Sequence, residues 1–180
     1  VMTYLTPSIA GKATMKNLTE HLSQYALYHR DERNILTHYA GIPLIMVAVF
    51  ALLYWPLFSL AGVVITPALL LFIGGMAFYL RLDLRFALVM FIFSGVSLLL
   101  AAQLASLPFG VWLASSVGLF VVGWVLQFIG HYYEGKKPAF VDDLVGLLVG
   151  PLFIVAELGF KLGLRKPLQH DIEQVAGKPH

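Results

Sequence analysis

Residues 86–133 read FALVMFIFSGVSLLLAAQLASLPFGVWLASSVGLFVVGWVLQFIGHYY and contain no Asp, Glu, Lys or Arg. Residues 34–80 form a second run that lacks all four of these residue types. Each run is more than twice as long as the roughly 20 apolar residues that cross a bilayer core of about 30 Å. Because the cores of soluble domains do not contain apolar runs of this length, the two runs predict an all-α polytopic membrane protein.

Each run is expected to fold as two helices joined by a tight, uncharged turn. The two breaks are at residues 56–62, PLFSLAG, and at residues 106–110, SLPFG, where Pro and Gly disfavour a continuous helix. The four predicted transmembrane helices therefore lie near residues 40–57, 61–80, 86–105 and 110–131.

The composition agrees with a single integral membrane domain over residues 1–180. Apolar residues make up 59% of the chain and charged residues 12%, which is about half of the roughly 25% that is usual for a soluble domain. The net charge of +2 is small and the basic residues are dispersed, so nucleic acid is not an expected partner. The absence of cysteine excludes disulfides, thiolate metal sites and a cysteine nucleophile.

A fifth apolar stretch, residues 144–164, contains Gly150-Pro151, where the proline is expected to kink or break a helix. Basic residues precede the first span, separate the second from the third, follow the fourth and recur in the tail. Since basic residues mark the cytoplasmic side, the N-terminus, the loop at residues 81–85 and residues 131–143 are expected there. The tail reaches the same side only if residues 144–164 form a re-entrant or interfacial helical hairpin. A plain fifth span is the alternative.

The remaining segments flank the four spans. Residues 1–38 are expected to be a cytoplasmic lead-in, and residues 132–180 a loop, the hairpin and a basic tail. Within the lead-in, residues 15–38 predict an amphipathic helix with four apolar contacts, Leu18, Leu22, Tyr25 and Leu36. Residues 1–16 lack a long apolar segment, so no secretory signal is expected in them.

Histidines are the residues most suited to chemistry in this chain. His29 and His38 precede the first predicted span, His131 ends the fourth and His170 follows the hairpin. The predicted topology brings all four to the cytoplasmic end, where imidazoles backed by carboxylates could hold Fe(II) or Zn(II). Glu134 shares a helical face with His131 and could be a ligand, a general base or an acceptor that orients the imidazole.

A simpler interpretation of these histidines stands beside this one. Interfacial histidines are common as headgroup anchors, and no HExxH-type helix or tight histidine cluster is present. His21 shares a helical face with Tyr25 and His29, which makes it an outside candidate for the site. His180 is the last residue and is not expected to take part.

Two long motifs carry a resemblance to a known family. The first comprises Tyr28-His29-Arg30, Asn34-Ile35-Leu36-Thr37-His38 and Gly41-Ile42-Pro43; the second comprises Gln127-Phe128-Ile129-Gly130-His131, Glu134, Pro138-Ala139 and Asp142. In this order and at this separation, over roughly residues 20–175, they resemble the 2-hydroxy fatty acid dioxygenase family. The tail pair His170-Asp171 extends the resemblance, and Asp143 departs from it, since an Asn is expected there.

The resemblance implies an Fe(II) enzyme of fatty acid α-oxidation. Its partners would be O2, the lipid bilayer and a long-chain 2-hydroxy fatty acid, from which C1 is cleaved to give CO2 and the acid one carbon shorter. The implied metal ligands are His29, His38, His131 and His170. Eukaryotic family members act in the endoplasmic reticulum membrane; a bacterial chain would lie in the inner membrane, with the site at the cytoplasmic face.

Three further residues receive roles from the same chemistry. Arg30 could steer the substrate carboxylate, or merely anchor the helix end at the positive-inside face. Asn34 could orient an oxygen or a ligand imidazole, or only cap the first helix. Glu134 is expected to act on a ligand rather than on the metal.

Two other classes of protein remain open from the sequence. A metal-free membrane protein that binds lipid or transports a small solute would use the histidines as anchors, although transport pathways usually show ionisable residues inside the spans. A di-iron lipid hydroxylase would need more histidines, in clustered motifs, than the six that are present.

Overall fold

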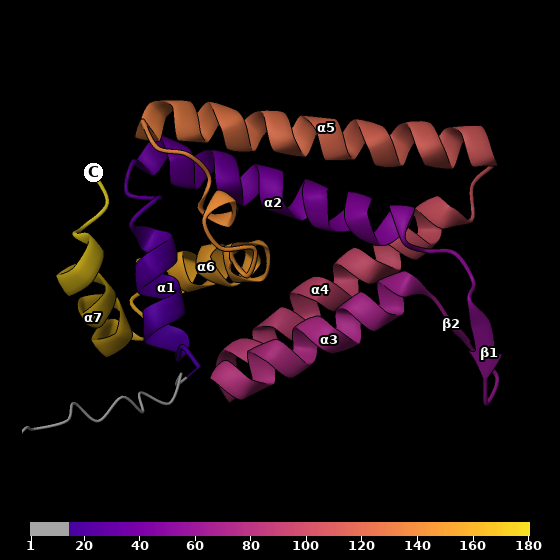
Figure 1. The fold of residues 1–180 in the computed structure, drawn as a ribbon, viewed down its shortest axis with the longest axis horizontal. Coiled ribbons are helices and arrows are strands. Elements are labelled where there is room, and N and C mark those ends of the chain that lie inside the picture. The colour runs from indigo at the N-terminus through magenta and orange to yellow at the C-terminus, as the bar shows by residue number, and fades with distance from the viewer. Residues whose placement is uncertain (1–14) are drawn as a thin grey trace, which may run out of the picture.

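Two long helices, α2 (Glu32–Leu52) and α5 (Phe109–Glu134), run side by side in opposite directions in the computed structural model, which describes residues 15–180 (Figure 1). Asp31 caps the start of α2 by accepting a hydrogen bond from the Arg33 N–H. Gly135, with a φ of 68°, ends α5 in the left-handed conformation. Most of residues 1–16, for which no secretory signal is expected, lies outside the described residues.

Small residues let α2 and α5 approach closely. A Cβ atom added at Gly130 would lie 2.3 Å from Oδ1 of Asn34, and one added at Gly41 would lie 2.9 Å from the carbonyl oxygen of Gly123. Neither position has room for a larger side chain unless the helices separate, as at small-residue contacts between membrane helices. The close packing sets the α2 residues one turn beyond Asn34 directly against the last turn of α5.

A second pair, α3 (Pro67–Leu82) and α4 (Leu84–Ala105), lies against the first (Figure 1). Many large apolar side chains of α3, α4 and α5 are exposed, as expected for surfaces that lipid covers. Among residues 15–180, three helices (α2, α4 and α5) are long and apolar enough to cross a membrane, and α3 is a shorter apolar helix. The prediction of an all-α polytopic membrane protein is therefore confirmed.

The predicted breaks are in the right places, but three helix boundaries differ by five residues or more. The first helix begins at Glu32 rather than near residue 40 and ends at Leu52 rather than near 57, and the second begins at Pro67 rather than at 61. Between them, β1 (Phe58–Leu60) and β2 (Val63–Ile65) form an antiparallel hairpin whose turn, Ala61-Gly62, has φ values of 49° and 79°. β-Branched residues suit a strand better than a helix, which explains the missed hairpin. Helices α4 and α5 begin within two residues of their predicted starts.

The lead-in is two pieces rather than one helix over residues 15–38. Helix α1 (Leu18–Ala26) starts at a capping box between Asn17 and Glu20, and the chain leaves the helical conformation before α2 begins. Leu18 and Leu22 are buried as predicted, whereas Leu36 is 58% exposed on α2, so its predicted contact is wrong. The break moves Leu36 onto a different helix, whose orientation is set by α5.

The C-terminal region forms a bent pair of helices. A 3-10 turn, η1 (Ala139–Val141), leads to α6 (Gly146–Lys161) and α7 (Lys166–Ala176), which meet at an angle of 115°. Of the predicted kink or break at Gly150-Pro151, a break is wrong, because α6 continues through Pro151 and loses only one backbone donor there. The chain turns instead at residues 162–165, where Gly163 and Arg165 have positive φ values of 76° and 53°.

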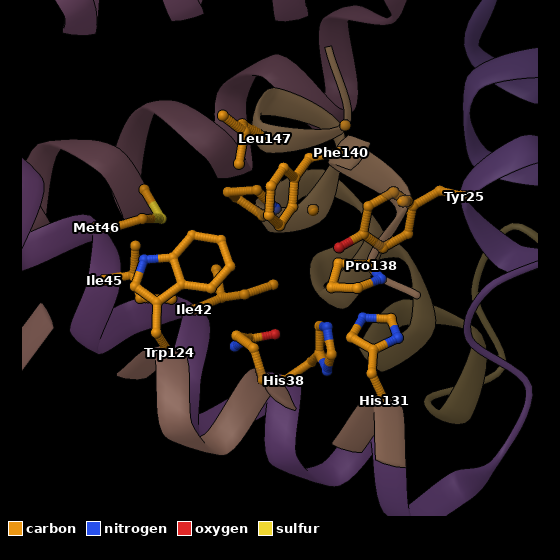
Figure 2. A pocket seen from close by; sticks show the side chains of 15 residues that line it. Tyr25, His38, Ile42, Ile45, Met46, Trp124, His131, Pro138, Phe140 and Leu147 are labelled. Atoms are coloured by element: carbon orange, nitrogen blue, oxygen red, sulfur yellow. The ribbon is translucent and has the colours of Figure 1, made fainter. Parts of the chain in front are cut away.

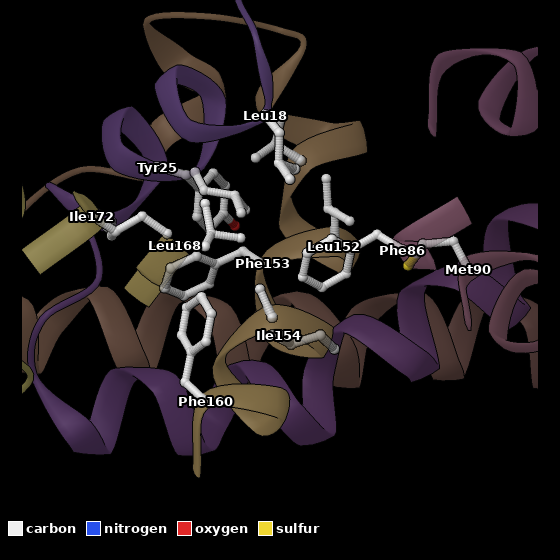
Figure 3. Close-up of a cluster of buried hydrophobic side chains, with 14 of the residues drawn as sticks. Leu18, Tyr25, Phe86, Met90, Leu152, Phe153, Ile154, Phe160, Leu168 and Ile172 are labelled. Carbon is white, nitrogen blue, oxygen red and sulfur yellow. The ribbon is translucent and has the colours of Figure 1, made fainter. Parts of the chain in front are cut away.

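The core beneath this end of the molecule joins α1, α6 and α7. Phe153 and Leu152 of α6 are fully buried in one cluster with Leu18 of α1 and Ile172 of α7 (Figure 3). Because α1 packs on both C-terminal helices, the segment between α1 and α2 is held against the end of α5.

Candidate metal centre

Three histidines from separate segments meet where α2 begins and α5 ends. His29 lies between α1 and α2, His38 lies in the second turn of α2, and His131 lies in the last turn of α5. The ring centres are 4.5 Å apart for His29 and His38, 4.8 Å for His29 and His131, and 5.1 Å for His38 and His131. At most 6% of each residue is exposed. One nitrogen from each ring lies within 4.8 Å of the others, so the group could hold a metal ion.

Backbone carbonyl groups determine which ring nitrogen carries the proton in His29 and His38. Nδ1 of His29 lies 2.8 Å from the carbonyl oxygen of Tyr25, and Nδ1 of His38 lies 2.8 Å from that of Asn34. A carbonyl oxygen only accepts, so both Nδ1 atoms donate, and each neutral ring has a lone pair at Nε2. Burial, followed by the neighbouring His38, lowers the pKa of His29 well below its usual value and keeps that ring neutral.

The two Nε2 atoms are 3.0 Å apart. With both protons on Nδ1, two lone pairs face each other, and a shared cation would turn this repulsion into attraction. Imidazole nitrogens bind a metal such as zinc at about 2.1 Å, so two of them on one ion lie at most about 4.2 Å apart. The observed separation fits that limit. Nδ1 of His131 is also buried without a hydrogen-bond partner within residues 15–180. Three neutral imidazoles suit Fe(II) or Zn(II).

The other histidines lie elsewhere. His170, the predicted fourth ligand, is exposed on α7, and the structure does not bring it to the other three. The reason is the turn at residues 162–165, after which α7 packs against α1 instead of reaching α2. His21 lies on α1 with its ring edge against Phe78. His180 contacts the α1–α2 segment through its backbone, donating to the carbonyl of Arg30 and accepting from the N–H of Glu32, both at 2.9 Å.

Glu134 is an anchor for the start of α2 in this structure. Its carboxylate accepts hydrogen bonds from the backbone N–H groups of Arg30 (2.9 and 3.0 Å) and Asp31 (2.8 Å), and from Nδ2 of Asn34 (3.0 Å). A negative charge at a helix N-terminus is favourable. Asn34 in turn presents the carbonyl that orients His38. Glu134 therefore acts on the position of His38 through α2, and it touches the metal group only indirectly.

Arg30 already has partners for every guanidinium nitrogen. Nη2 pairs with Oε1 of Glu157 on α6 at 2.8 Å, Nη1 donates to the carbonyl of Gly177 at 3.1 Å, and Nε donates to the carbonyls of Ala26 and His29. Both members of the ion pair are buried. The guanidinium thus connects α1, α6 and the tail, and a role in steering a substrate carboxylate gains no support from its contacts.

The loop after α5 closes over the histidines. Nζ of Lys136 donates to the carbonyl of Leu27 at 2.6 Å, and Asp142 accepts from the hydroxyl of Tyr28 and pairs with Lys137. Asp143, the departure from the family pattern, pairs with Lys16 at 3.1 Å on the surface, and that contact lowers the pKa of its carboxyl. The departure therefore lies outside the metal group.

A cavity of about 90 Å³ opens beside His38 and His131 (Figure 2). Three side chains of α5 that line it, Trp124, Gln127 and His131, lie on one helical face. Each has a buried nitrogen without a hydrogen-bond partner in the described part of the chain: Nε1 of Trp124, Nε2 of Gln127 and Nδ1 of His131. Buried polar groups are normally paired, so three in one cavity wall indicate a place for a polar ligand.

Tyr25 completes the opposite wall. Its ring stacks on His29 with the centres 4.1 Å apart, and its hydroxyl points into the cavity (Figure 2). Gly150 makes room for it, since a Cβ atom there would lie 2.9 Å from the hydroxyl oxygen. Burial raises the pKa of Tyr25, so the phenol stays protonated and can donate a hydrogen bond.

Sequence reasoning missed four of these residues. Gln127 precedes His131 by one turn in the second motif, and that spacing was a usable signal. Tyr25 was assigned only to apolar packing, and Trp124 and Glu157 offered no signal, because their roles depend on contacts between helices.

The sequence matches known proteins over most of its length. Residues 15–162 match the family model described as Mpo1-like, 2-hydroxy-palmitic acid dioxygenase Mpo1-like. The 2-hydroxy-palmitic acid dioxygenase MPO1 of Saccharomyces cerevisiae is 35% identical over 165 residues, which cover 87% of this chain and 90% of the yeast protein. No solved structure matches the chain. The agreement covers both motifs and all three clustered histidines, and the chain therefore belongs to the Mpo1-like family of 2-hydroxy-palmitic acid dioxygenases.

Proposed function

We propose that this protein is an Fe(II)-dependent dioxygenase that removes C1 from long-chain 2-hydroxy fatty acids. The products are CO2, water and the acid one carbon shorter, and O2 alone balances the oxidation without a separate reductant. The observation that carries the metal is the 3.0 Å approach of two Nε2 lone pairs, with a third buried imidazole beside them. Family membership supports the substrate class.

His29, His38 and His131 are the proposed metal ligands. As neutral groups they leave the charge of the ion available to an anionic substrate. Bound Fe(II) would supply a Lewis-acidic centre for the carboxylate and 2-hydroxyl of the substrate and a redox partner for O2. The carbonyls of Tyr25 and Asn34 hold two of the rings in the tautomer that binds a metal.

The cavity wall would orient the polar head of the substrate. A 2-hydroxy carboxylate offers acceptors at adjacent carbons, and the wall offers the unpaired amide of Gln127, the indole N–H of Trp124 and the phenol of Tyr25. Donors that lack protein partners gain a full hydrogen bond when the ligand arrives. Glu134 and Arg30 act one step further out, because they fix the segment that carries His29 and Asn34.

The site is proposed to lie at the cytoplasmic face, in the inner membrane if the protein is bacterial and in the endoplasmic reticulum if it is eukaryotic. The tail lies beside the α1–α2 segment, which supports one side for both. Since the chain has no cysteine, single cysteines at Ser59, Leu107, Lys136 and Val175 can be labelled with an impermeant thiol reagent. Labelling of positions 136 and 175 from opposite sides would refute this topology.

The reaction is tested with protein purified anaerobically and loaded with Fe(II). Mass spectrometry should detect the shortened acid from 2-hydroxypalmitate in air and none under nitrogen. Equal product without O2 would refute the dioxygenase proposal. Protein that neither contains iron nor takes it up would instead favour a metal-free lipid-binding or transport protein. Zinc recovered after overexpression would require exchange before the assay, because imidazole sites accept either metal.

A further inference from the structure

We infer that a second, apolar cavity, which continues from the metal pocket between α2, α3, α4, α5 and α6, binds the hydrocarbon chain of the substrate and sets its maximum length. The inference rests on the proposed function for the identity of the polar head. It concerns a different part of the molecule, since none of the three histidines lines this cavity.

The two cavities share a wall. The larger one has a volume of about 390 Å³. Five residues line both cavities: Ile45, Met46, Trp124, Leu147 and Pro151. Figure 2 shows Trp124, Ile45 and Met46 on the side of the metal pocket away from Tyr25 and His131. A ligand whose head lies at the histidines therefore has a direct way into the larger cavity past Trp124.

The lining of the larger cavity suits hydrocarbon. Its residues are apolar apart from Ser94, Tyr79 and the indole N–H of Trp124 at the shared wall, and the hydroxyl of Tyr79 donates to the carbonyl of Leu148 at 2.8 Å. A cavity with so little polar lining stays dry and takes apolar molecules. Of the cavity-lining groups that lack partners within residues 15–180, those of Gln127 and His131 belong to the metal pocket alone, and that of Trp124 lies at the wall that the two cavities share. The metal pocket thus suits the polar head of an amphiphile, and the larger cavity suits its hydrocarbon chain.

The dimensions suit a long chain. Along α2, twelve residues separate His38 from Phe50, which lines the larger cavity, and this corresponds to about 18 Å of helix. Phe72 and Phe120 also line the cavity, from α3 and α5. These three rings would limit the chain length, while Gly75 of α3 leaves the middle of the cavity open.

Apolar burial predicts how turnover should depend on the chain. Each CH2 group that enters the cavity should raise kcat/KM by about fourfold, until the chain reaches the distal rings. Beyond that length the gain should stop, since an additional CH2 has no space. Chain-length profiles of kcat/KM for saturated 2-hydroxy acids therefore report directly on the cavity.

Two adjacent glycines provide a matched pair of variants. A Cβ atom at Gly75 meets nothing closer than Cε2 of Tyr79 at 3.9 Å, so Gly75→Leu fills cavity space without a backbone clash. Gly74 is exposed, outside the cavity, and a Cβ atom there meets nothing within 4 Å. Both changes replace a helical glycine with leucine, so Gly74→Leu controls for helix propensity and added hydrophobicity.

Gly75→Leu should lower kcat/KM for 2-hydroxypalmitate at least tenfold and leave 2-hydroxydecanoate within twofold of the unchanged protein. Its iron content should remain the same. Gly74→Leu should have the same chain-length profile of kcat/KM as the unchanged protein. Conversely, Phe120→Ala should move the maximum to longer acids, which tests the cavity by a gain rather than a loss. Unaltered profiles in Gly75→Leu and Phe120→Ala, with turnover intact, would overturn the inference and leave the proposed function standing.

A binding measurement separates the two proposals. In the variant Trp55→Phe/Trp112→Phe, Trp124 is the remaining tryptophan, and a 2-hydroxy acid brominated in mid-chain should quench its fluorescence. Gly75→Leu should raise the Kd of the brominated acid, measured by this quenching, at least tenfold. If quenching behaves so but no 2-hydroxy acid is turned over by iron-loaded protein, the proposed function fails and the cavity assignment stands. Quenching by brominated phospholipid that the acid does not displace would mean that bilayer lipid fills the cavity, and would overturn the inference.

Discussion

Two groups of buried polar residues lie next to each other where α2 begins and α5 ends, and they differ in how completely they are paired. In the first, the side chains of Arg30, Glu134 and Glu157 make hydrogen bonds of 2.7 to 3.1 Å with one another, with the backbone or with Asn34. In the second, the Nε2 lone pairs of His29 and His38 face each other, and Nδ1 of His131 has no hydrogen-bond partner within residues 15–180. A buried group with complete partners stabilises the fold, whereas one with incomplete partners has kept its capacity for a ligand. The three charged residues therefore hold segments of the fold together in this structure, and the three histidines are the candidates for chemistry.

The largest effect should come from the second group. His38→Ala should lose at least about 1,000-fold in turnover, because removal of one ligand from three loses the metal itself. Iron per protein, measured by mass spectrometry of the metal, should fall with activity. His170→Ala is the matched control, since that side chain is exposed and outside the group; it should retain both iron and activity. Loss of iron in the control would restore His170 to the ligand set.

The next largest effect should come from the first group, as a loss of stability. Arg30→Met leaves Glu157 buried and unpaired, which should lower the free energy of unfolding by about 3–5 kcal/mol. Denaturant unfolding in a mild detergent measures this. Arg30→Met/Glu157→Leu should recover most of the loss, because neither charge then remains buried without a partner. Failure of the double variant to recover would mean that the other bonds of Arg30, to Gly177 and Ala26, carry the stability.

Glu134 joins the two groups and should show a mixed effect. Glu134→Gln keeps the shape but removes the charge from four hydrogen bonds and from the N-terminus of α2. The stability loss should be about 1–3 kcal/mol, with a severalfold fall in kcat and part of the iron retained. Full activity with unchanged stability would contradict the anchoring role, and complete loss of iron at unchanged stability would indicate a direct ligand.

The smallest effect on stability should accompany a clear effect on substrate binding. Gln127→Leu removes a buried amide nitrogen that has no partner, so the free energy of unfolding should stay within about 0.5 kcal/mol or rise. If the amide binds the head of the substrate, KM should increase about tenfold while iron content is unchanged. Equal KM values for the variant and the unchanged protein would remove Gln127 from the head-binding wall.

The sequence identifies most residues of the two polar groups, but it does not show which of them have complete hydrogen-bond partners. The motifs containing His29, His38 and His131 point to the three histidines that the structure brings together, because side chains at fixed positions in two motifs are a strong local signal. For Arg30 the sequence leaves both substrate steering and an anchoring role open, and two partners of its side chain, Glu157 and Gly177, lie more than 120 residues away in the chain. A charge near a site has the same appearance in sequence whether it is free or paired.

The sequence by itself determined the membrane class, the positions of the four apolar helices and the breaks between them, because these follow from the length and charge of contiguous segments. It also determined the family. The tertiary structure decided which histidines meet, where α6 ends and which polar groups remain unpaired. It placed His170 outside the group through a turn at Gly163, and it set Nε2 of Gln127 against Gly41, where this nitrogen has no hydrogen-bond partner within residues 15–180. These outcomes depend on distances between helices far apart in the chain, and no local pattern of residues specifies such distances.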